Sequence, residues 1–330
     1  MKKNRFLKAA LILAALIILG LYIRIDYFIV QPSRAVDLST LIAVENAYID
    51  QDTGKLYLVT ISQQRASIIT AAYGYFHPYM ELKAIDTVIP EGMDEDEYRL
   101  QLREIMNESQ QLAQVVALKR AGYEVDIVSD GVIVVGMLDD APAENYLVEG
   151  DIIITVDDKR VALATEVSAL VQDRLVGEEV KLGITRDEDD LELIIPTGAN
   201  PDDPDMPFLG ILIQTSSWEP SIPLQIDMNT GRIGGPSAGL MFVLEILNQL
   251  TPEDITSGKM IAGTGTIDLN ENIGRVGGVR QKVVAAKNVG AEIFFVPEGN
   301  YYQAVNVISN IKVVPVSNLE DVLEYISSLD

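Results

Sequence analysis

A chain of 330 residues with 48% hydrophobic residues, 24 glycines and 14 prolines has the composition of a globular protein of about two domains. It contains no cysteine and one histidine, His77, which excludes disulfides, thiolate catalysis, cysteine-based zinc sites and multi-histidine metal sites. The formal net charge of −24 opposes binding to a phosphate backbone, so nucleic acid is not an expected partner.

An uncharged apolar run from Ala9 to Ile23 follows a basic N-terminus. At about 1.5 Å of rise per residue, this run lies near the lower limit for crossing a bilayer. A cleaved signal peptide is the alternative, but no small-x-small cleavage site follows, and Tyr22, Tyr27 and Phe28 could form an interfacial aromatic belt. The sequence therefore predicts an uncleaved transmembrane anchor over residues 6–28. Basic residues before the anchor predict a cytoplasmic N-terminus and an extracytoplasmic body.

The segments after the anchor predict a linker, a strand and a long helix. Residues 32–40 are expected to be a linker, whereas residues 54–61 have the Tyr, Leu, Val and Thr content of a strand. A further apolar stretch covers residues 68–76. Apolar side chains spaced mostly by three and four predict a helix over residues 94–121, ended by Gly122.

The middle of the chain predicts a strand at 131–137, a turn leading into a short helix at 139–145, a strand at 152–156, a helix at 165–176 and a hairpin of 179–185 with 191–196. Residues 201–207 are expected to be a polar, proline-rich connector. This order resembles a PDZ domain of the bacterial type. In such domains a peptide C-terminus adds a strand to a sheet edge, and backbone N–H groups hold its carboxylate.

The carboxylate-binding loop of that PDZ-like segment is expected at four residues, Phe208, Leu209, Gly210 and Ile211. Their apolar-apolar-Gly-apolar pattern resembles the family loop, which comes late in circularly permuted bacterial versions. An ordinary strand entry with a glycine bend is the alternative for this tetrapeptide. Beyond it, the sequence predicts strands at 210–214, 260–265 and 292–296, an apolar stretch at 222–228, a turn at 229–231, and helices from Pro236 towards Leu250 and over 278–290.

Two residues at the start of these last helices indicate hydrolytic chemistry. Ser237 stands among small residues in the segment 234–239, and Lys282 opens an apolar helix, where desolvation can leave its amine neutral. The α/β-hydrolase elbow needs a histidine after the serine, and none follows. Phosphate binding and a purely structural glycine turn are further alternatives. The segment lacks the Lys-Ser/Thr ending of a P-loop, and Pro236 removes one N–H donor, so a Ser-Lys hydrolase is the favoured interpretation.

Four segments resemble the proteolytic domain of Lon proteases in motif, order and approximate spacing. They are residues 234–239, 263–265, 277–291 and 294–297. The resemblance implies an α/β (α+β) proteolytic domain in two pieces, 40–126 and 208–330, with a PDZ domain inserted at 127–207 and one transmembrane helix in front. This is the layout of the membrane-anchored, PDZ-containing Lon-like proteases of Gram-positive bacteria, the YlbL-like group.

By that resemblance Ser237 is the nucleophile, Lys282 is the general base, and Thr264 orients the lysine. Backbone N–H groups of Gly235 and Ser237 are expected to stabilise the oxyanion. Many Lon proteases carry an acidic residue three positions before the serine, where this chain has Gly234. No Walker A sequence and no room for an ATPase domain are found, so no nucleotide cofactor is expected. No metal is expected either, because the chain has no cysteine and one histidine.

The sequence thus predicts an ATP-independent serine endopeptidase of the bacterial cell membrane. Its expected partners are protein or peptide substrates, with C-terminal tails bound by the PDZ domain, and further copies of itself, in a hexamer as the resemblance implies. The alternative is a catalytically silent PDZ adaptor or scaffold at the membrane. The presence of Ser237, Thr264 and Lys282 weighs against that alternative.

Overall fold

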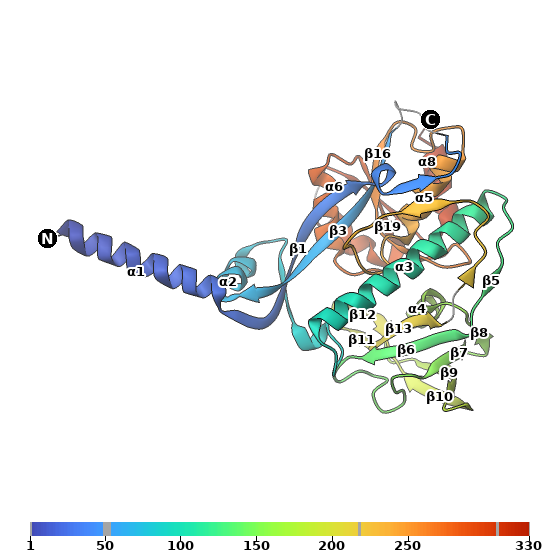
Figure 1. Ribbon diagram of the computed structural model, residues 1–330, viewed down its shortest axis with the longest axis horizontal. Helices are drawn as coiled ribbons and strands as arrows, with labels where there is room; N and C mark the ends of the chain where they lie inside the picture. The colour runs from blue at the N-terminus through green and yellow to red at the C-terminus, as the bar shows by residue number, and fades with distance from the viewer. Residues whose placement is uncertain (1, 49–53, 217–218, 308–309, 330) are drawn as a thin grey trace.

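The computed structural model describes residues 2–48, 54–216, 219–307 and 310–329. A long N-terminal helix projects from a body that contains two six-stranded sheets (Figure 1). The helix α3 (Glu95–Arg120) crosses the body between the two sheets and contacts elements on both sides. The arrangement makes α3 one of the connections between the two halves of the molecule.

The N-terminal helix α1 (Lys2–Tyr22) does not meet the requirements of a membrane span. Within the described residues, no helix is both long enough and apolar enough to cross a bilayer. The predicted anchor over residues 6–28 is therefore wrong, and the single-pass membrane location that followed from it is not supported. Lysines and arginines occupy the start of α1, so its apolar part from Ala9 to Tyr22 rises only about 21 Å, against about 30 Å of hydrocarbon. The last residues assigned to the anchor lie in a strand instead.

The first sheet joins residues from both ends of the chain. Its strands follow the order β20 (Lys312–Val316), β19 (Ile293–Pro297), β16 (Met260–Gly263), β3 (Lys55–Ser67), β1 (Arg24–Asp37) and β4 (Glu81–Ala84). The pairs from β20 to β3 are parallel, and those of β3 with β1 and β1 with β4 are antiparallel. The long strands β1 and β3 form a ribbon that reaches out towards α2 (Ile68–Phe76) and α1 (Figure 1).

The predicted linker at 32–40 is part of this ribbon. Residues up to Asp37 belong to β1, and a short 3-10 helix, η1 (Leu38–Thr40), follows. The register of β1 on β3 shifts between Pro32 and Ala35. Such an irregularity tolerates a proline, which lacks the N–H needed for a regular ladder. Local composition therefore indicated a linker, whereas pairing with β3 produces a strand.

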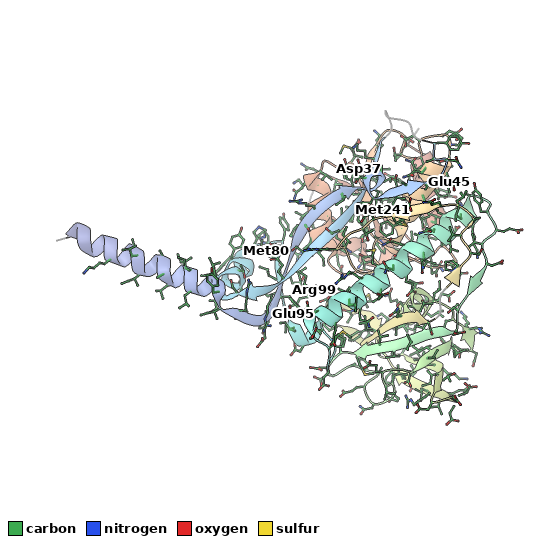
Figure 2. All side chains as sticks on the ribbon, in the orientation of Figure 1. Asp37, Glu45, Met80, Glu95, Arg99 and Met241 are labelled. Atoms are coloured by element: carbon green, nitrogen blue, oxygen red, sulfur yellow. The ribbon has the colours of Figure 1, made fainter. Side chains whose placement is uncertain are left out.

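Helices cover the first sheet and contribute to its core. They are α5 (Gly239–Leu250), α6 (Val279–Asn288), α7 (Tyr301–Val305) and α8 (Leu319–Ser327). In α5 almost every residue is buried, and Met241 is fully enclosed within the body (Figure 2). A Cβ atom at Gly263 of β16 would lie 2.6 Å from the Met241 sulfur, so a larger residue there would force the Met241 side chain of α5 to move.

Smaller elements complete this half of the molecule. They are β2 (Ile42–Val44) paired with β15 (Ile226–Met228), β5 (Ile127–Val128) paired with β14 (Glu219–Pro220), β17 (Thr266–Ile267) paired with β18 (Ile273–Gly274), and the 3-10 helices η2 (Ile85–Thr87) and η3 (Glu298–Asn300).

The second sheet is built from the middle of the chain. Its path is β10 (Asp189–Pro196), β9 (Glu179–Arg186), β7 (Ile152–Val156), β6 (Gly131–Met137) and β13 (Ile211–Ser216), with β8 (Lys159–Arg160) paired to β7. The helix α4 (Ala164–Gln172) packs against it. The strands β6 and β7 and the hairpin of β9 with β10 confirm the predicted elements. Asp187 and Glu188 both have positive φ, as the two-residue turn of a hairpin requires.

Three predictions for the middle of the chain differ from the structure. Residues 139–145 form turns without a helix, and α4 ends at Gln172 rather than 176. The Thr197 hydroxyl donates to the Leu175 carbonyl at 3.2 Å, which holds that stretch in a turn. The expected connector at 201–207 lies largely in β12 (Asp203–Phe208), which pairs with β11 (Gly198–Asn200). Prolines are compatible with a two-stranded ribbon because each strand has an unpaired side.

The second sheet begins and ends at neighbouring points. The N–H of Asp130 donates to the Ser216 carbonyl at 3.3 Å, and the hydroxyl oxygen of Ser129 lies 3.2 Å from the same carbonyl oxygen. Residues 211–216 pair with β6 and so belong to the second sheet, although they lie beyond residue 207, the predicted end of the PDZ domain. The domain limits 40–126, 127–207 and 208–330 stay a prediction.

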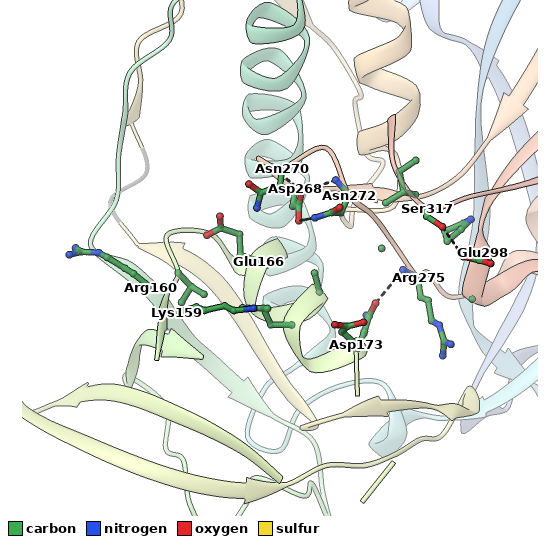
Figure 3. A pocket seen from close by; sticks show the side chains of 18 residues that line it. Lys159, Arg160, Glu166, Asp173, Asp268, Asn270, Asn272, Arg275, Glu298 and Ser317 are labelled. Carbon is green, nitrogen blue, oxygen red and sulfur yellow. Dashed lines mark hydrogen bonds between the residues drawn. The ribbon is translucent and has the colours of Figure 1, made fainter. Parts of the chain in front are cut away.

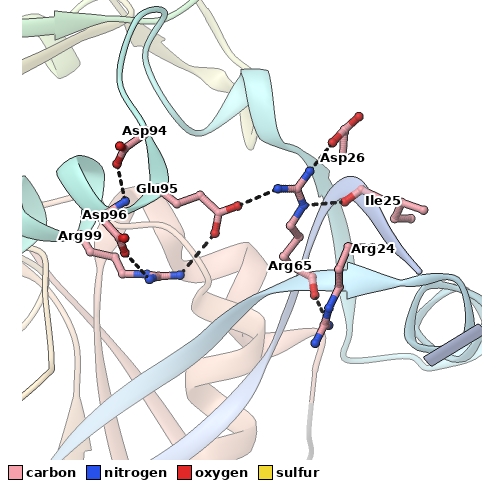
Figure 4. A network of polar contacts seen from close by, with 8 residues as sticks. All are labelled: Arg24, Ile25, Asp26, Arg65, Asp94, Glu95, Asp96 and Arg99. Carbon is pink, nitrogen blue, oxygen red and sulfur yellow. Dashed lines mark hydrogen bonds and ion pairs between the residues drawn. The ribbon is translucent and has the colours of Figure 1, made fainter. Parts of the chain in front are cut away.

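The N-terminus of α3 is tied to the ribbon by exposed charged groups. Asp94 caps the helix, since its carboxylate accepts from the N–H groups of Asp96 and Glu97 at 2.8 and 2.9 Å. Glu95 pairs with Arg65 of β3 at 3.3 Å and with Arg99 at 3.3 Å (Figure 4). Exposed pairs of this kind contribute little stability each, so the network fixes orientation more than it adds free energy.

Candidate active site

Ser237 lies in the short turn that precedes α5. The helix begins at Gly239, slightly later than the predicted start at Pro236. The Ser237 carbonyl accepts hydrogen bonds from the N–H of Gly265 and from the Thr264 hydroxyl, both at 3.0 Å. Gly235 has a φ of +89°, a backbone conformation that side chains rarely adopt, so the glycine is required for this turn. The serine is thereby fixed at the mouth of the helix with its side chain partly exposed.

Lys282 lies in the first turn of α6 and points at the serine. Its Nζ lies 2.9 Å from Ser237 Oγ and 3.0 Å from Thr264 Oγ1. Gly278 precedes the helix in the left-handed conformation, with a φ of +67°, and sets the angle at which α6 starts. The structure thus brings together the three side chains that the sequence proposed for catalysis, although they come from three separate segments.

The environment of Lys282 favours the neutral amine. The side chain is buried, with 3% relative exposure, and burial lowers the pKa of Lys282 from 10.5 to about 7. A neutral amine has a lone pair and can accept the Ser237 hydroxyl proton across the 2.9 Å contact. Thr264, itself buried, gives its proton to the Ser237 carbonyl and so offers a lone pair to Nζ. This arrangement orients the lysine toward the serine.

The backbone N–H groups of Gly235 and Ser237, both expected to bind an oxyanion, differ in whether they are free to do so. The Gly235 N–H already donates to the Leu102 carbonyl at 2.8 Å, so in this geometry it is not available to an oxyanion. The Ser237 N–H has no hydrogen-bond acceptor among the described residues. It lies beside the N-terminus of α5, where the helix dipole favours negative charge.

Two residues of α3 that sequence reasoning did not assign hold the serine turn in place. The Ser109 hydroxyl donates to the Pro236 carbonyl at 3.2 Å, and Leu102 supplies the carbonyl that binds Gly235. Ser109 is buried, with 4% relative exposure. A serine on the otherwise apolar face of a helix was the available signal, but its partner lies more than a hundred residues away, and no local pattern identifies such a contact.

The four residues of the expected carboxylate-binding loop connect β12 to β13. Gly210 has a φ of +73°, and a Cβ there would lie 2.6 Å from the Ala141 side chain. The carbonyls of Leu209 and Gly210 accept from the N–H groups of Ala143 and Leu138 at 3.1 and 2.8 Å. Phe208 ends β12 and Ile211 begins β13. The loop thus leads directly into the outermost strand of the second sheet.

A separate cavity of about 570 Å³ lies between α4 and the segment around β18 (Figure 3). Lysine, arginine, aspartate, glutamate and asparagine side chains surround it, and none of the three clustered residues Ser237, Thr264 and Lys282 lines it. Within the part of the chain that the structure describes, no cluster of three or more His, Asp or Glu side chains could hold a metal ion.

Comparison with known proteins identifies two families in the chain. Residues 223–328 match the family of the Lon protease C-terminal proteolytic domain, and residues 110–197 match the PDZ domain family. The first of these segments contains the serine, threonine and lysine described above. The chain therefore contains a segment homologous to Lon proteolytic domains together with a PDZ domain.

Individual relatives agree with this assignment. The Archaeal Lon protease of Methanocaldococcus jannaschii is 31% identical over 109 residues, which cover 33% of this chain and 16% of the relative. The Lon protease of Rickettsia bellii is 34% identical over 95 residues, or 28% of this chain and 12% of the relative. The chain thus spans only a small part of the length of these proteins. Homology to their proteolytic domains supports a serine-type peptidase.

A solved PDZ structure is similar in sequence to the middle of the chain. It is the crystal structure of the PDZ domain of the SdrC-like protein from Listeria monocytogenes, at 27% identity, covering 27% of this chain and 92% of that one, with a TM-score of 0.25. At that score the PDZ assignment rests on the family match and not on this superposition.

Proposed function

We propose that the chain is an ATP-independent serine endopeptidase that uses Ser237 as nucleophile and Lys282 as general base. The observation that carries the proposal is the 2.9 Å contact between Lys282 Nζ and Ser237 Oγ, made by a lysine that is buried. Homology of residues 223–328 to Lon proteolytic domains supports the reaction class.

The reaction would proceed by two acyl transfers. Neutral Lys282 takes the Ser237 hydroxyl proton as Oγ attacks the substrate carbonyl carbon, and the Ser237 N–H stabilises the oxyanion. Protonated Lys282 then gives that proton to the leaving amine as the peptide C–N bond breaks, which leaves an acyl ester on Ser237. Water, deprotonated by Lys282, hydrolyses the ester and restores the serine. Thr264 positions the amine throughout by accepting a hydrogen bond from it.

In this proposal the PDZ domain recruits or positions substrates by binding their C-terminal tails through the Phe208–Ile211 loop and β13. In this proposal the substrates are unfolded or flexible proteins. The same proposal includes self-assembly to the hexamer that the Lon resemblance implies. Analytical ultracentrifugation of the purified chain would test it.

The proposal is tested by trapping the nucleophile. The purified chain is treated with a fluorophosphonate probe, and the modified peptide is located by mass spectrometry. Labelling at Ser237 is expected in the native protein and in no sample of Ser237→Ala, while Lys282→Met should label far more slowly. A protein that binds C-terminal peptides but takes no label at Ser237 would be a PDZ adaptor rather than an enzyme.

A further inference from the structure

The helix α3 contacts the second sheet through a buried carboxylate. Glu108 accepts a hydrogen bond from the Thr215 N–H at 3.0 Å and a second from the Thr215 hydroxyl. Both residues are buried, with 8% and 6% relative exposure. Burial raises the pKa of Glu108, and the hydrogen bonds from Thr215 oppose that rise. The contact therefore joins a buried carboxyl group of one half of the molecule to a backbone N–H of the other.

The backbone N–H that Glu108 occupies belongs to a strand edge. β13 is the last strand of its sheet, and among the described residues no other strand pairs with the side that faces away from β6. Along a strand, the backbone groups of alternate residues point to the same side, so Ile211 and Ile213 present theirs to the same edge as Thr215. We call this side of residues 211–216 the β13 edge.

The β13 edge is accessible at one end and closed at the other. Residues 211–214 are partly exposed, whereas Thr215 is buried. The first residue of α4 adds to the closure, since the Ala164 N–H donates to Thr215 Oγ1 at 3.0 Å. The far end of α4 is also held, because Gln172 Oε1 accepts from the Arg275 N–H at 3.2 Å. The closed end is thus built from α3 and α4 together, and both helices are fixed against the rest of the chain.

We propose that Glu108 limits the length of peptide that the β13 edge accepts. This inference rests on the proposed binding of C-terminal tails. A tail whose carboxylate lies at the Phe208–Ile211 loop runs antiparallel to β13, and about three of its residues can pair along 211–213. The next pairing position is the Thr215 N–H, which Glu108 already occupies. A longer extended tail must either leave the edge there or displace a buried carboxylate, so the site reads only the last few residues of a substrate.

The inference is tested by peptide binding to the full chain carrying Ser237→Ala, so that no peptide is cleaved. Two peptides with free carboxylates and the same apolar C-terminal tripeptide, one of three and one of six residues, are compared by isothermal titration. With Glu108 present, the two dissociation constants should agree within about twofold. With Glu108→Ala the longer peptide should bind about tenfold tighter than the shorter, because its upstream residues can pair at Thr215.

Two further variants control this experiment. Glu104→Ala removes an exposed carboxylate one turn earlier on α3 and should leave the ratio of dissociation constants unchanged. Glu108→Gln keeps the size of the side chain and weakens its hydrogen bonds, so it should give an intermediate ratio, and it replaces Glu108→Ala if that variant fails to fold by thermal unfolding.

The inference is overturned if the six-residue peptide already binds about tenfold tighter with Glu108 present, or if Glu108→Ala and Glu108→Gln both leave the ratio unchanged. Absence of binding by both peptides would instead remove the proposed peptide-binding role and this inference with it. Failure of Ser237 to react with an acylating probe would affect the proposed catalysis alone.

Discussion

At the scale of single residues, the site depends on one amine being neutral where most lysines are charged. The geometry supplies no carboxylate to Lys282, since Gly234 stands where many Lon proteases carry an acid and the two polar contacts of Nζ are hydroxyls. A carboxylate partner would favour the charged form and raise the pKa. Burial without such a partner has the opposite effect, which suits a general base that operates near neutral pH.

The first prediction concerns the base itself. Lys282→Arg keeps the positive charge but presents a guanidinium that does not deprotonate, so cleavage of an unfolded substrate such as casein should fall to background. Lys282→Met and Ser237→Ala should be equally inactive. Circular dichroism should show all three folded, and substantial turnover by Lys282→Arg would exclude the lysine as base.

The second prediction concerns pH. Because the folded pKa of Lys282 is about 7 and the model-compound value is 10.5, the unfolded chain binds more protons than the native state between these values. Stability from this group therefore rises with pH from about 7 to about 10.5, and is lowest below pH 7. Activity should rise with pH through about 7 as the amine becomes neutral. Lys282→Met should unfold at a higher temperature than the native chain at pH 6, and this difference should shrink towards pH 10.

The third prediction concerns Thr264. Replacement by valine preserves the shape but removes the hydroxyl that accepts from Lys282 Nζ and donates to the Ser237 carbonyl. Loss of an acceptor disfavours the charged amine, so the inflection of the pH–rate profile should move to lower pH. The value of kcat should fall about tenfold with little change in KM, because ordering of the amine is lost. An unchanged inflection would mean that Thr264 does not act on the lysine.

At the scale of elements, α3 has two roles that adjacent residues perform. Glu108 contacts Thr215 in the second sheet, and Ser109 contacts Pro236 in the serine turn. Neighbouring positions on a helix point about 100° apart, so one helix between two layers can present one residue to each. The periodicity of the sequence predicted this helix closely, over 94–121 against Glu95–Arg120 in the structure. It did not predict which face meets which partner.

The fourth prediction tests the contact of α3 with the serine turn. Ser109→Ala removes a hydrogen bond worth roughly 0.5–1.5 kcal/mol, so kcat should fall about two- to tenfold if the bond positions the nucleophile. Labelling of Ser237 by a fluorophosphonate should slow by the same factor. Asn107→Ala, at an exposed position two residues earlier, is the matched control and should leave both rates unchanged. Loss of stability with unchanged kcat would show a purely structural role for Ser109.

At the scale of the whole molecule, the second sheet is connected to the rest through points that lie close together. The hydrogen bond from the Asp130 N–H to the Ser216 carbonyl places both ends of this part within contact distance. The strand pair β5 and β14 continues that contact on the other side. An insertion with adjacent ends can be removed without stretching the remaining chain.

The fifth prediction follows from that adjacency. Replacement of residues 131–215 with a short Gly/Ser linker should give a folded protein that still cleaves small peptides. Cleavage of protein substrates with apolar C-termini should fall more than peptide cleavage, because strand addition and carboxylate capture are lost. If the deletion reduced cleavage of proteins and of small peptides by the same factor, the PDZ domain would have no role in substrate choice. Failure to fold would contradict the insertion itself.

The sequence by itself determined the elements whose signals are local. Runs rich in β-branched residues located β6 and β7, and the positions of Ser237, Thr264 and Lys282 were singled out from glycine-rich turns and a family resemblance. Where the signal was composition alone, local reasoning failed: prolines indicated a linker at 32–40 and a connector at 201–207, but cross-strand pairing formed strands there. An apolar run indicated a membrane span, yet the helix that contains it is too short in its apolar part.

Only the tertiary structure decided the contacts between distant segments. The 2.9 Å separation of Lys282 Nζ and Ser237 Oγ depends on α5 and α6 being packed on one sheet, and Leu102 occupies the Gly235 N–H through a contact from α3. The burial that lowers the pKa of Lys282 is likewise a product of that packing. Hydrogen bonding and desolvation depend on what lies within a few ångströms in space. Neighbours along the chain do not specify them, which is why the Glu108–Thr215 contact had no counterpart in the sequence pattern.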